Sequence, residues 1–123
     1  MDIQQFMERW QGHGYEKGEM QTFWLMLFRV LFSIDEPEDW LIFEHRIKGK
    51  FIDARIPSTH VLIEQKSIDR DLNAAFLQAK SYDALLPFKD KSKWIVVSDF
   101  QSFHVYDMDL LDPKPEIILL ENL

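Results

Sequence analysis

The stretch Val61-Leu62-Ile63-Glu64-Gln65-Lys66 decides the expected fold of this chain. Its first half is almost continuously apolar, which is typical of a strand buried on both faces. Segments 41–47 and 50–56, which precede it, are also short and rich in β-branched or aromatic residues, and turn residues separate them. We therefore predict three strands in succession, at 41–47, 50–56 and 60–66.

Apolar residues at helical spacing surround these strands. We predict a short first helix, a nearly buried central second helix, and a third helix after the strands that is capped by Asp69 or Asp71. Further strands are expected at 94–98, 103–106 and 117–120. This order predicts one α/β domain over residues 1–123, with a mixed sheet flanked by helices in a three-layer α/β/α arrangement. The apolar helix positions are Phe6, Met7 and Trp10, then Phe23, Trp24, Leu27, Phe28 and Leu31, then Leu72, Ala75, Phe76, Ala79, Tyr82 and Leu86.

Composition agrees with one folded domain. Of the 123 residues, 46% are hydrophobic and 14% are aromatic, which is enough for a substantial core. The N-terminus lacks the pattern of a secretory signal, and the longest apolar stretch, 23–32, is interrupted by Arg29 and too short to span a bilayer. The absence of cysteine excludes disulfides and thiolate metal sites and fits the cytosol. We expect a soluble, cytoplasmic protein with no membrane partner.

Charge is distributed unevenly along the chain. A formal net charge of -7 argues against a protein that coats nucleic acid by charge alone. Between residues 41 and 66, however, there are five basic and three acidic residues, so the excess acid lies elsewhere. Candidate phosphate contacts are Lys48, Lys50, Arg55 and Lys80, and each is also explained as an ordinary surface charge.

Three residues on the second and third predicted strands form the candidate site. Strand side chains alternate between faces, so Glu64 and Lys66 point the same way, and strand pairing can bring Asp53 beside them. Two carboxylates with room for water suit Mg²⁺, with Mn²⁺ as a substitute. From the spacing alone, an exposed strand face with a cross-strand ion pair is the commoner explanation. The buried character of the third strand favours a site, because burying these charges without partners or a metal is costly.

The same residues resemble a known family. Phe51-Ile52-Asp53, Ile63-Glu64-Gln65-Lys66 and the helical Gln78 with Tyr82 look like the three motifs of PD-(D/E)XK nucleases, although Ile52 stands where the family name has Pro. The resemblance is closer to the N-terminal nuclease domain of MmeI-like type IIG or IIL restriction-modification enzymes, and it covers almost the whole chain. The matching pieces are Glu19-Met-Gln-Thr-Phe23, Phe43-Glu-His45, Asp53, Ile63-Glu-Gln-Lys-Ser67, Asp71-Leu72, Gln78-Ala79, Tyr82 and Ser98-Asp-Phe100.

This resemblance implies a fold, an activity and partners. The fold is the restriction-endonuclease-like αβββαβ core, and the activity is Mg²⁺-dependent cleavage of double-stranded DNA. The partners would be methyltransferase and target-recognition regions in the same longer polypeptide. This chain contains no Gly-rich cofactor loop and no Asn-Pro-Pro-Tyr-like methyltransferase motif, so it would supply only the nuclease module.

The resemblance also implies roles for single residues. Asp53, Glu64, Lys66 and Gln78 would be catalytic, and Asp53, Glu64 and Glu19 would bind the metal. Two alternatives stay open: Gln78 can be part of a polar helix rim, and Glu19 can be a first-turn glutamate favoured by the helix dipole. The four histidines lack ligand spacing, so no zinc site is expected. The alternative function is a catalytically inactive nuclease-like fold that binds DNA or protein.

Overall fold

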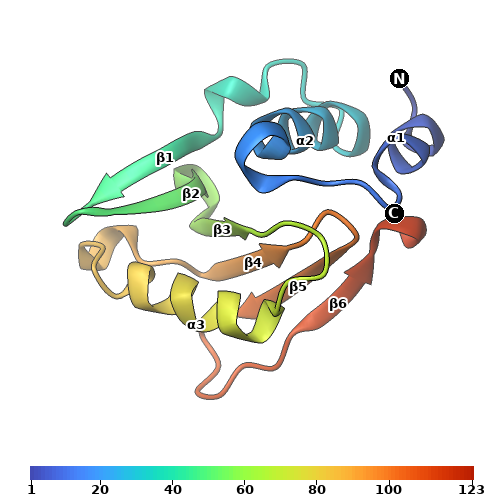
Figure 1. Cartoon of the computed structure of the whole chain (residues 1–123). Coiled ribbons are helices and arrows are strands. Elements are labelled where there is room, and N and C mark those ends of the chain that lie inside the picture. Colours follow the sequence, from blue (N-terminus) through green and yellow to red (C-terminus); the bar gives the residue numbers. More distant parts are fainter.

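A six-stranded mixed sheet forms the middle layer of this protein, with helices on both of its faces (Figure 1). The computed structural model describes residues 1–123. The strands follow one another across the sheet in sequence order, and only β3 and β4 run parallel, because α3 connects them. The elements are α1 (Ile3–Trp10), α2 (Glu16–Leu31), β1 (Ile42–Ile47), β2 (Lys50–Ile56), β3 (Val61–Gln65), α3 (Leu72–Asp83), β4 (Trp94–Ser98), β5 (Ser102–Asp107) and β6 (Glu116–Leu119). This arrangement confirms the predicted three-layer α/β/α fold.

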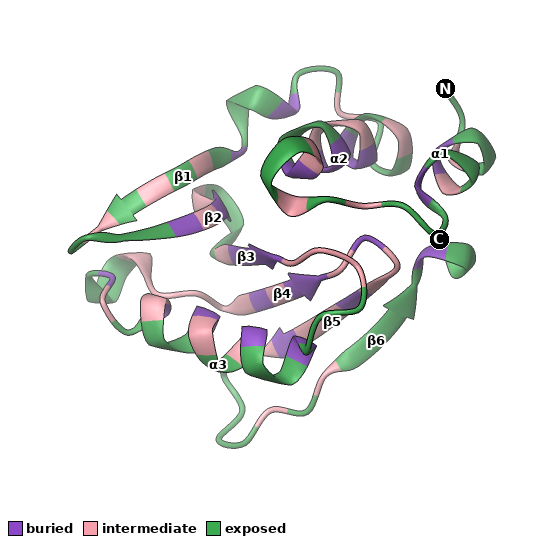
Figure 2. Ribbon diagram, in the orientation of Figure 1, coloured by how far each residue is buried: buried purple, intermediate pink, exposed green.

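The sheet separates two hydrophobic cores. Helices α1 and α2 cover one face, where the aromatic side chains of Phe6, Trp10 and Phe23 pack together with Phe100 and Phe103. Helix α3 covers the other face with Leu72, Ala75 and Ala79. Figure 2 shows buried residues on the inner sides of the helices and in the middle strands β3 and β4, while β6 is exposed along its length.

The second helix differs from its prediction. It is not a central, nearly buried element, because only five of its sixteen residues are buried and Leu31 is 37% exposed. The sheet occupies the centre and α2 covers one face of it (Figure 1). A dense apolar sequence favours burial, but a helix on the outer layer of a small domain can bury only one side.

Local signals explain where the helices begin. Asp71, and not Asp69, caps α3, since its side chain accepts hydrogen bonds from the backbone N–H groups of Asn73 and Ala74. The loop before α2 is fixed by Gly14, whose φ is +151° and where an added Cβ would lie 2.2 Å from the Phe100 ring. This close approach requires glycine, and it holds the start of α2 against the β4–β5 turn.

The predicted strand limits hold to within a residue or two. In the structure β3 ends at Gln65, so Lys66 is the first residue after the strand. No helix combines the length and the apolar character that crossing a membrane requires.

Candidate metal and catalytic site

The candidate site lies where strands β2 and β3 separate. Their backbone pairing ends at Ala54 opposite Ile63. One step further, the Gln65 N–H donates to Asp53 Oδ2 at 2.8 Å instead of to a strand carbonyl. The Asp53 carboxylate therefore replaces the backbone carbonyl that the Gln65 N–H would otherwise meet on β2. The split opens the sheet beside the carboxylate.

The hairpin of β1 and β2 changes face at this same point. Phe43 and Ala54 pack into the core under α2, whereas Ile47 and Ile52 pack into the core under α3. In a regular strand, residues two or four apart share one face, so the hairpin must twist between these pairs. Glu44 lies there with a left-handed φ of 52°. A non-glycine residue in this conformation costs about 1–3 kcal/mol, and such strain collects at functional sites.

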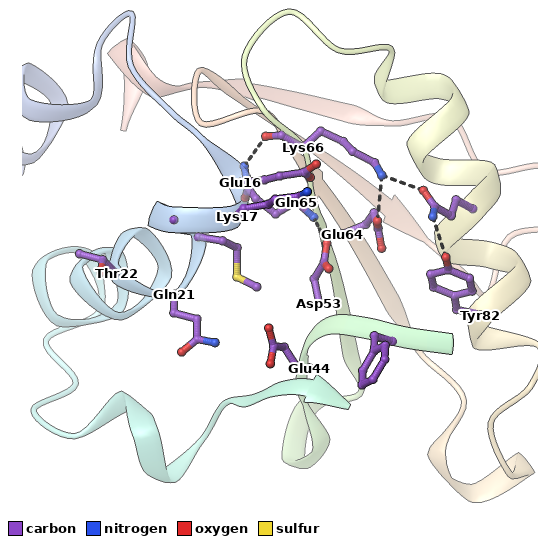
Figure 3. A pocket seen from close by; sticks show the side chains of 14 residues that line it. Glu16, Lys17, Gln21, Thr22, Glu44, Asp53, Glu64, Gln65, Lys66 and Tyr82 are labelled. Carbon is purple, nitrogen blue, oxygen red and sulfur yellow. Dashed lines mark hydrogen bonds and ion pairs between the residues drawn. The ribbon is translucent and has the colours of Figure 1, made fainter. Parts of the chain in front are cut away.

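A chain of polar contacts connects β3 to α3 (Figure 3). Lys66 Nζ lies 3.2 Å from Glu64 Oε1 and donates to Gln78 Oε1 at 2.8 Å. Gln78 Nε2 in turn donates to the Tyr82 hydroxyl oxygen at 2.6 Å. Gln78 and Tyr82 are four residues apart and so lie on one side of the helix. The structure thus brings Asp53, Glu64, Lys66 and Gln78 together in one pocket.

Burial controls the charge of the two carboxyl groups. Glu64 is 3% exposed, and its Oε2 is buried without a hydrogen-bond partner. Desolvation, followed by repulsion from Asp53, raises the pKa of Glu64 to about 8 despite the nearby Lys66 ammonium. Desolvation also raises the pKa of Asp53, and this effect exceeds the opposing effect of the hydrogen bond from Gln65. Protonation of Glu64 relieves this repulsion in the absence of a cation.

The residues present fit a hard divalent cation. The pocket has a volume of about 500 Å³ and is lined mainly by polar residues, including Asp53 and Glu64. The unpartnered Glu64 Oε2 is a ready oxygen ligand. No group of three or more His, Cys, Asp or Glu residues is arranged to hold a metal. Two carboxylates with water completing the shell is the coordination that Mg²⁺ tolerates well, so the donor set suits Mg²⁺.

Glu19, expected as a third metal ligand, does not line the pocket that holds Asp53 and Glu64. Its Oε1 accepts the backbone N–H of Tyr15 at 3.2 Å, so it stabilises the start of α2. Glu16, three residues earlier, lines the pocket instead, and its backbone N–H donates to Ser67 Oγ. The sequence places both glutamates in the first turn, and only the docking of α2 decides which one faces the site.

Arg55 is also placed differently from its prediction as a phosphate contact. It is 4% exposed, and its guanidinium contacts His45 Nδ1 at 3.2 Å and the Asp90 carbonyl oxygen at 3.3 Å. It is therefore not accessible to a phosphate. Lys48, Lys50 and Lys80 are exposed, as a phosphate contact requires.

Gln65 is a positioning residue that the sequence analysis did not single out. Its side chain is fully buried on the α2 side of the sheet, where Gln65 Oε1 accepts from Trp24 Nε1 at 2.8 Å. Gln65 Nε2 donates to the Lys66 carbonyl oxygen at 2.9 Å. Gln65 thereby holds the Asp53 carboxylate through its own backbone N–H and the Lys66 backbone through its own side chain. The available signal was a polar residue on each face of an otherwise apolar strand.

The fold and the site define a three-layer α/β domain that gathers a buried glutamate, a half-buried aspartate and a lysine where two strands of its sheet part. The family model described as "MmeI, N-terminal domain" matches residues 1–123. The chain therefore belongs to the family of MmeI N-terminal domains. No curated protein matches the chain, and no solved structure does.

Proposed function

We propose that this domain hydrolyses phosphodiester bonds of double-stranded DNA with Mg²⁺, for which Mn²⁺ can substitute. The observation that carries the proposal is the pair of carboxyl groups beside Lys66, of which Glu64 is buried and has one oxygen free of any partner. Asp53, Glu64 and Lys66 correspond to the motif of PD-(D/E)XK nucleases. Membership in the MmeI N-terminal domain family supports a place in a larger restriction-modification enzyme, with methyltransferase and target-recognition regions in the same polypeptide.

Asp53 and Glu64 are the residues that would hold the cation. Bound there, it supplies polarisation of the scissile phosphate and a more acidic water molecule. The Gln65 N–H keeps the Asp53 carboxylate aimed into the pocket. Because the pocket is already preorganised, little reorientation is needed when substrate arrives.

Lys66 orients the reacting groups. An ammonium has three N–H donors. Lys66 donates to Gln78 Oε1 and forms an ion pair with Glu64 Oε1. Donor capacity therefore remains for the attacking water or for a phosphate oxygen on which charge develops. Gln78 is itself held by Tyr82, so the ammonium is fixed from the side of α3. Gln78 thus acts by positioning Lys66.

Substitution of the site residues tests this function. Asp53→Ala and Lys66→Ala should each lower the rate of DNA cleavage in Mg²⁺ by about 10²–10³-fold or more, while thermal unfolding shows an intact fold. Lys114→Ala is the matched control, because Lys114 lies in an exposed loop where it pairs with Asp112. Parental cleavage rates in folded Asp53→Ala and Lys66→Ala would show that the assigned site is wrong.

Metal titration separates this function from an inactive nuclease-like fold that binds DNA or protein. An active site should bind Mn²⁺ or Mg²⁺ in the wild-type chain and lose that binding in Asp53→Ala. Ca²⁺ should occupy the site and support DNA binding without hydrolysis, since its longer bonds position water less well. Robust cleavage in Ca²⁺ alone or in a chelator would exclude the proposed mechanism.

A further inference from the structure

An exposed aromatic side chain lies at the mouth of the pocket. Phe51 is 55% exposed and lines the pocket with Asp53, which follows two residues later on β2. The strand register pairs Phe51 with Arg46 of β1. Directly opposed residues share a face of the sheet, with Cβ atoms about 5 Å apart. Arg46 and Phe51 therefore form an arginine–phenylalanine pair beside the candidate site.

The hairpin that carries this pair is a basic projection of an acidic protein. Residues 45–51 contain Arg46, Lys48 and Lys50 and no acidic residue, although the net charge of the chain is -7. All three cations are exposed, and the five ion pairs of the structure involve other residues. Lys48 and Gly49 both have positive φ, as a tight two-residue hairpin turn requires. The turn therefore presents the cations at the end of the hairpin, which extends from the sheet in Figure 1.

A single exposed phenylalanine is ordinary on a protein surface. The position of Phe51 is what makes it informative, because it lines a polar pocket and lies opposite Arg46, whose guanidinium forms no ion pair. A guanidinium binds a phosphate through two parallel hydrogen bonds, and an aromatic ring packs on a sugar or a base. Phe51 and Asp53 are about 7 Å apart along the strand, which equals about two nucleotides of rise along a DNA strand.

We propose that the Arg46–Phe51 pair binds the DNA strand next to the bond that is cut. Arg46 holds a backbone phosphate, and Phe51 packs against the neighbouring sugar or base. Lys48 and Lys50 contact phosphates further along the same duplex. This proposal rests on the proposed function of the pocket, and it gives to Arg46 the role that Arg55, being buried, cannot fill.

DNA binding by variants of the chain tests the pair. Fluorescence anisotropy with a labelled duplex is measured at several salt concentrations, in Ca²⁺ and in a chelator. Arg46→Ala should weaken binding several-fold at low salt and reduce the slope of log K against log salt by about 0.9, the value for one lost phosphate contact. Arg9→Ala is the matched control, because it removes the same charge from the exposed side of α1.

The two halves of the pair have separate signatures. Phe51→Ala should weaken binding with no change in the salt slope, and Phe51→Tyr should restore it, because a ring contact releases no counterions. Arg46→Lys keeps the charge, so it should keep the parental slope while losing affinity, since an ammonium cannot bind a phosphate in the two-pronged way. Circular dichroism melts establish that each variant is folded.

Several outcomes would overturn the proposal. The first is an Arg46→Ala variant with the same affinity and salt slope as Arg9→Ala. The second is a wild-type chain that does not bind DNA at low salt. The third is an RNA duplex that binds the wild-type chain as tightly as DNA does and whose affinity falls equally in Arg46→Ala. The nuclease proposal fails separately. If the chain binds DNA as described but never cleaves it in Mg²⁺ or Mn²⁺, the DNA-binding role of Arg46 and Phe51 is supported and the catalytic assignment is wrong.

Discussion

Glu64 is 3% exposed, and only one of its two carboxylate oxygens has a partner. A stable domain gains nothing from this arrangement, because an uncompensated buried charge opposes folding. Lys66 is close enough to offset part of the cost, yet the pKa of Glu64 still rises to about 8. Desolvation and the neighbouring Asp53 together outweigh the ammonium. This deficit of positive charge around Glu64 suits a cation-binding carboxylate, since a bound cation would supply the positive charge.

The raised pKa of Glu64 predicts a pH-dependent stability of the metal-free protein. The carboxyl group changes from its ordinary pKa of 4.5 when unfolded to about 8 when folded, so the folded state binds more protons between these values. Its stabilising contribution is complete below pH 4.5 and is lost as the pH rises to 8. We therefore expect the melting temperature in a chelator to fall between pH 5 and pH 8.

Glu64→Gln should remove most of this dependence and raise the melting temperature at pH 8, because it removes the buried charge. Glu116→Gln is the control, since Glu116 lies exposed on β6. A melting temperature that is equally flat for wild type and Glu64→Gln over this range would contradict the account of the buried carboxyl group.

At the scale of elements, the site depends on three structural units that meet where the sheet splits. The β1–β2 hairpin supplies Asp53 and the change of face at Glu44. Helix α3 supplies Gln78, and β3 carries Glu64 with Lys66 directly after it. Helix α2 contributes from the opposite side of the sheet, through the hydrogen bond from Trp24 to Gln65. The geometry of Lys66 is thus controlled from both faces.

The contact between Trp24 and Gln65 can be tested with two matched substitutions. Trp24→Phe leaves the buried Gln65 oxygen without its donor, which costs about 1–3 kcal/mol beyond the loss of ring volume. Trp10→Phe is the control, because the buried Trp10 Nε1 has no partner to lose. We expect urea unfolding to show a larger loss of stability for Trp24→Phe.

Only Trp24→Phe should also lower the rate of DNA cleavage at saturating substrate, since it loosens the end of β3, directly before Lys66. Equal effects of the two substitutions on stability and on cleavage would mean that both tryptophans act through packing alone.

At the scale of the whole molecule, charge limits what the domain does by itself. With a net charge of -7, few exposed cations, chiefly those of the basic hairpin, are available to hold phosphates. A few such contacts give weak binding that falls steeply with salt. No helix-turn-helix, zinc finger or basic helix occurs that could read base edges. The family match is compatible with our proposal that target recognition lies in other regions of a larger enzyme.

We accordingly expect the isolated chain to bind unrelated duplexes with similar, weak affinity and to cut slowly even with metal. A nuclease module that depends on tethering to a target-reading region gains effective concentration only at the correct site. The measurement is a comparison of affinities for several duplexes at low and moderate salt. Nanomolar, sequence-selective binding at moderate salt would show that target recognition lies within these residues.

Much of the fold could be predicted because hydrophobic periodicity is a local property. The β-branched and aromatic content of 50–56 and the apolar run at 61–63 identified β2 and β3, and a helical pattern after Asp69 or Asp71 identified α3. The alternation of side chains along any strand predicted that Glu64 and Lys66 would point together, and strand pairing predicted Asp53 beside them. The structure brings these three residues into one pocket, whereas their catalytic roles stay predictions.

Other features were decided by tertiary structure alone. Glu16 rather than Glu19 faces the pocket because the packing of α2 on the sheet sets the rotation of its first turn. Arg55 is buried while Arg46 is exposed, although both are arginines on neighbouring strands, because the segment after α3 covers only one of them. The sequence alone determined which residues can carry charge at the site and on which strands they lie. Their burial, and hence their availability and their pKa, arises from residues distant in the chain, which no local pattern encodes.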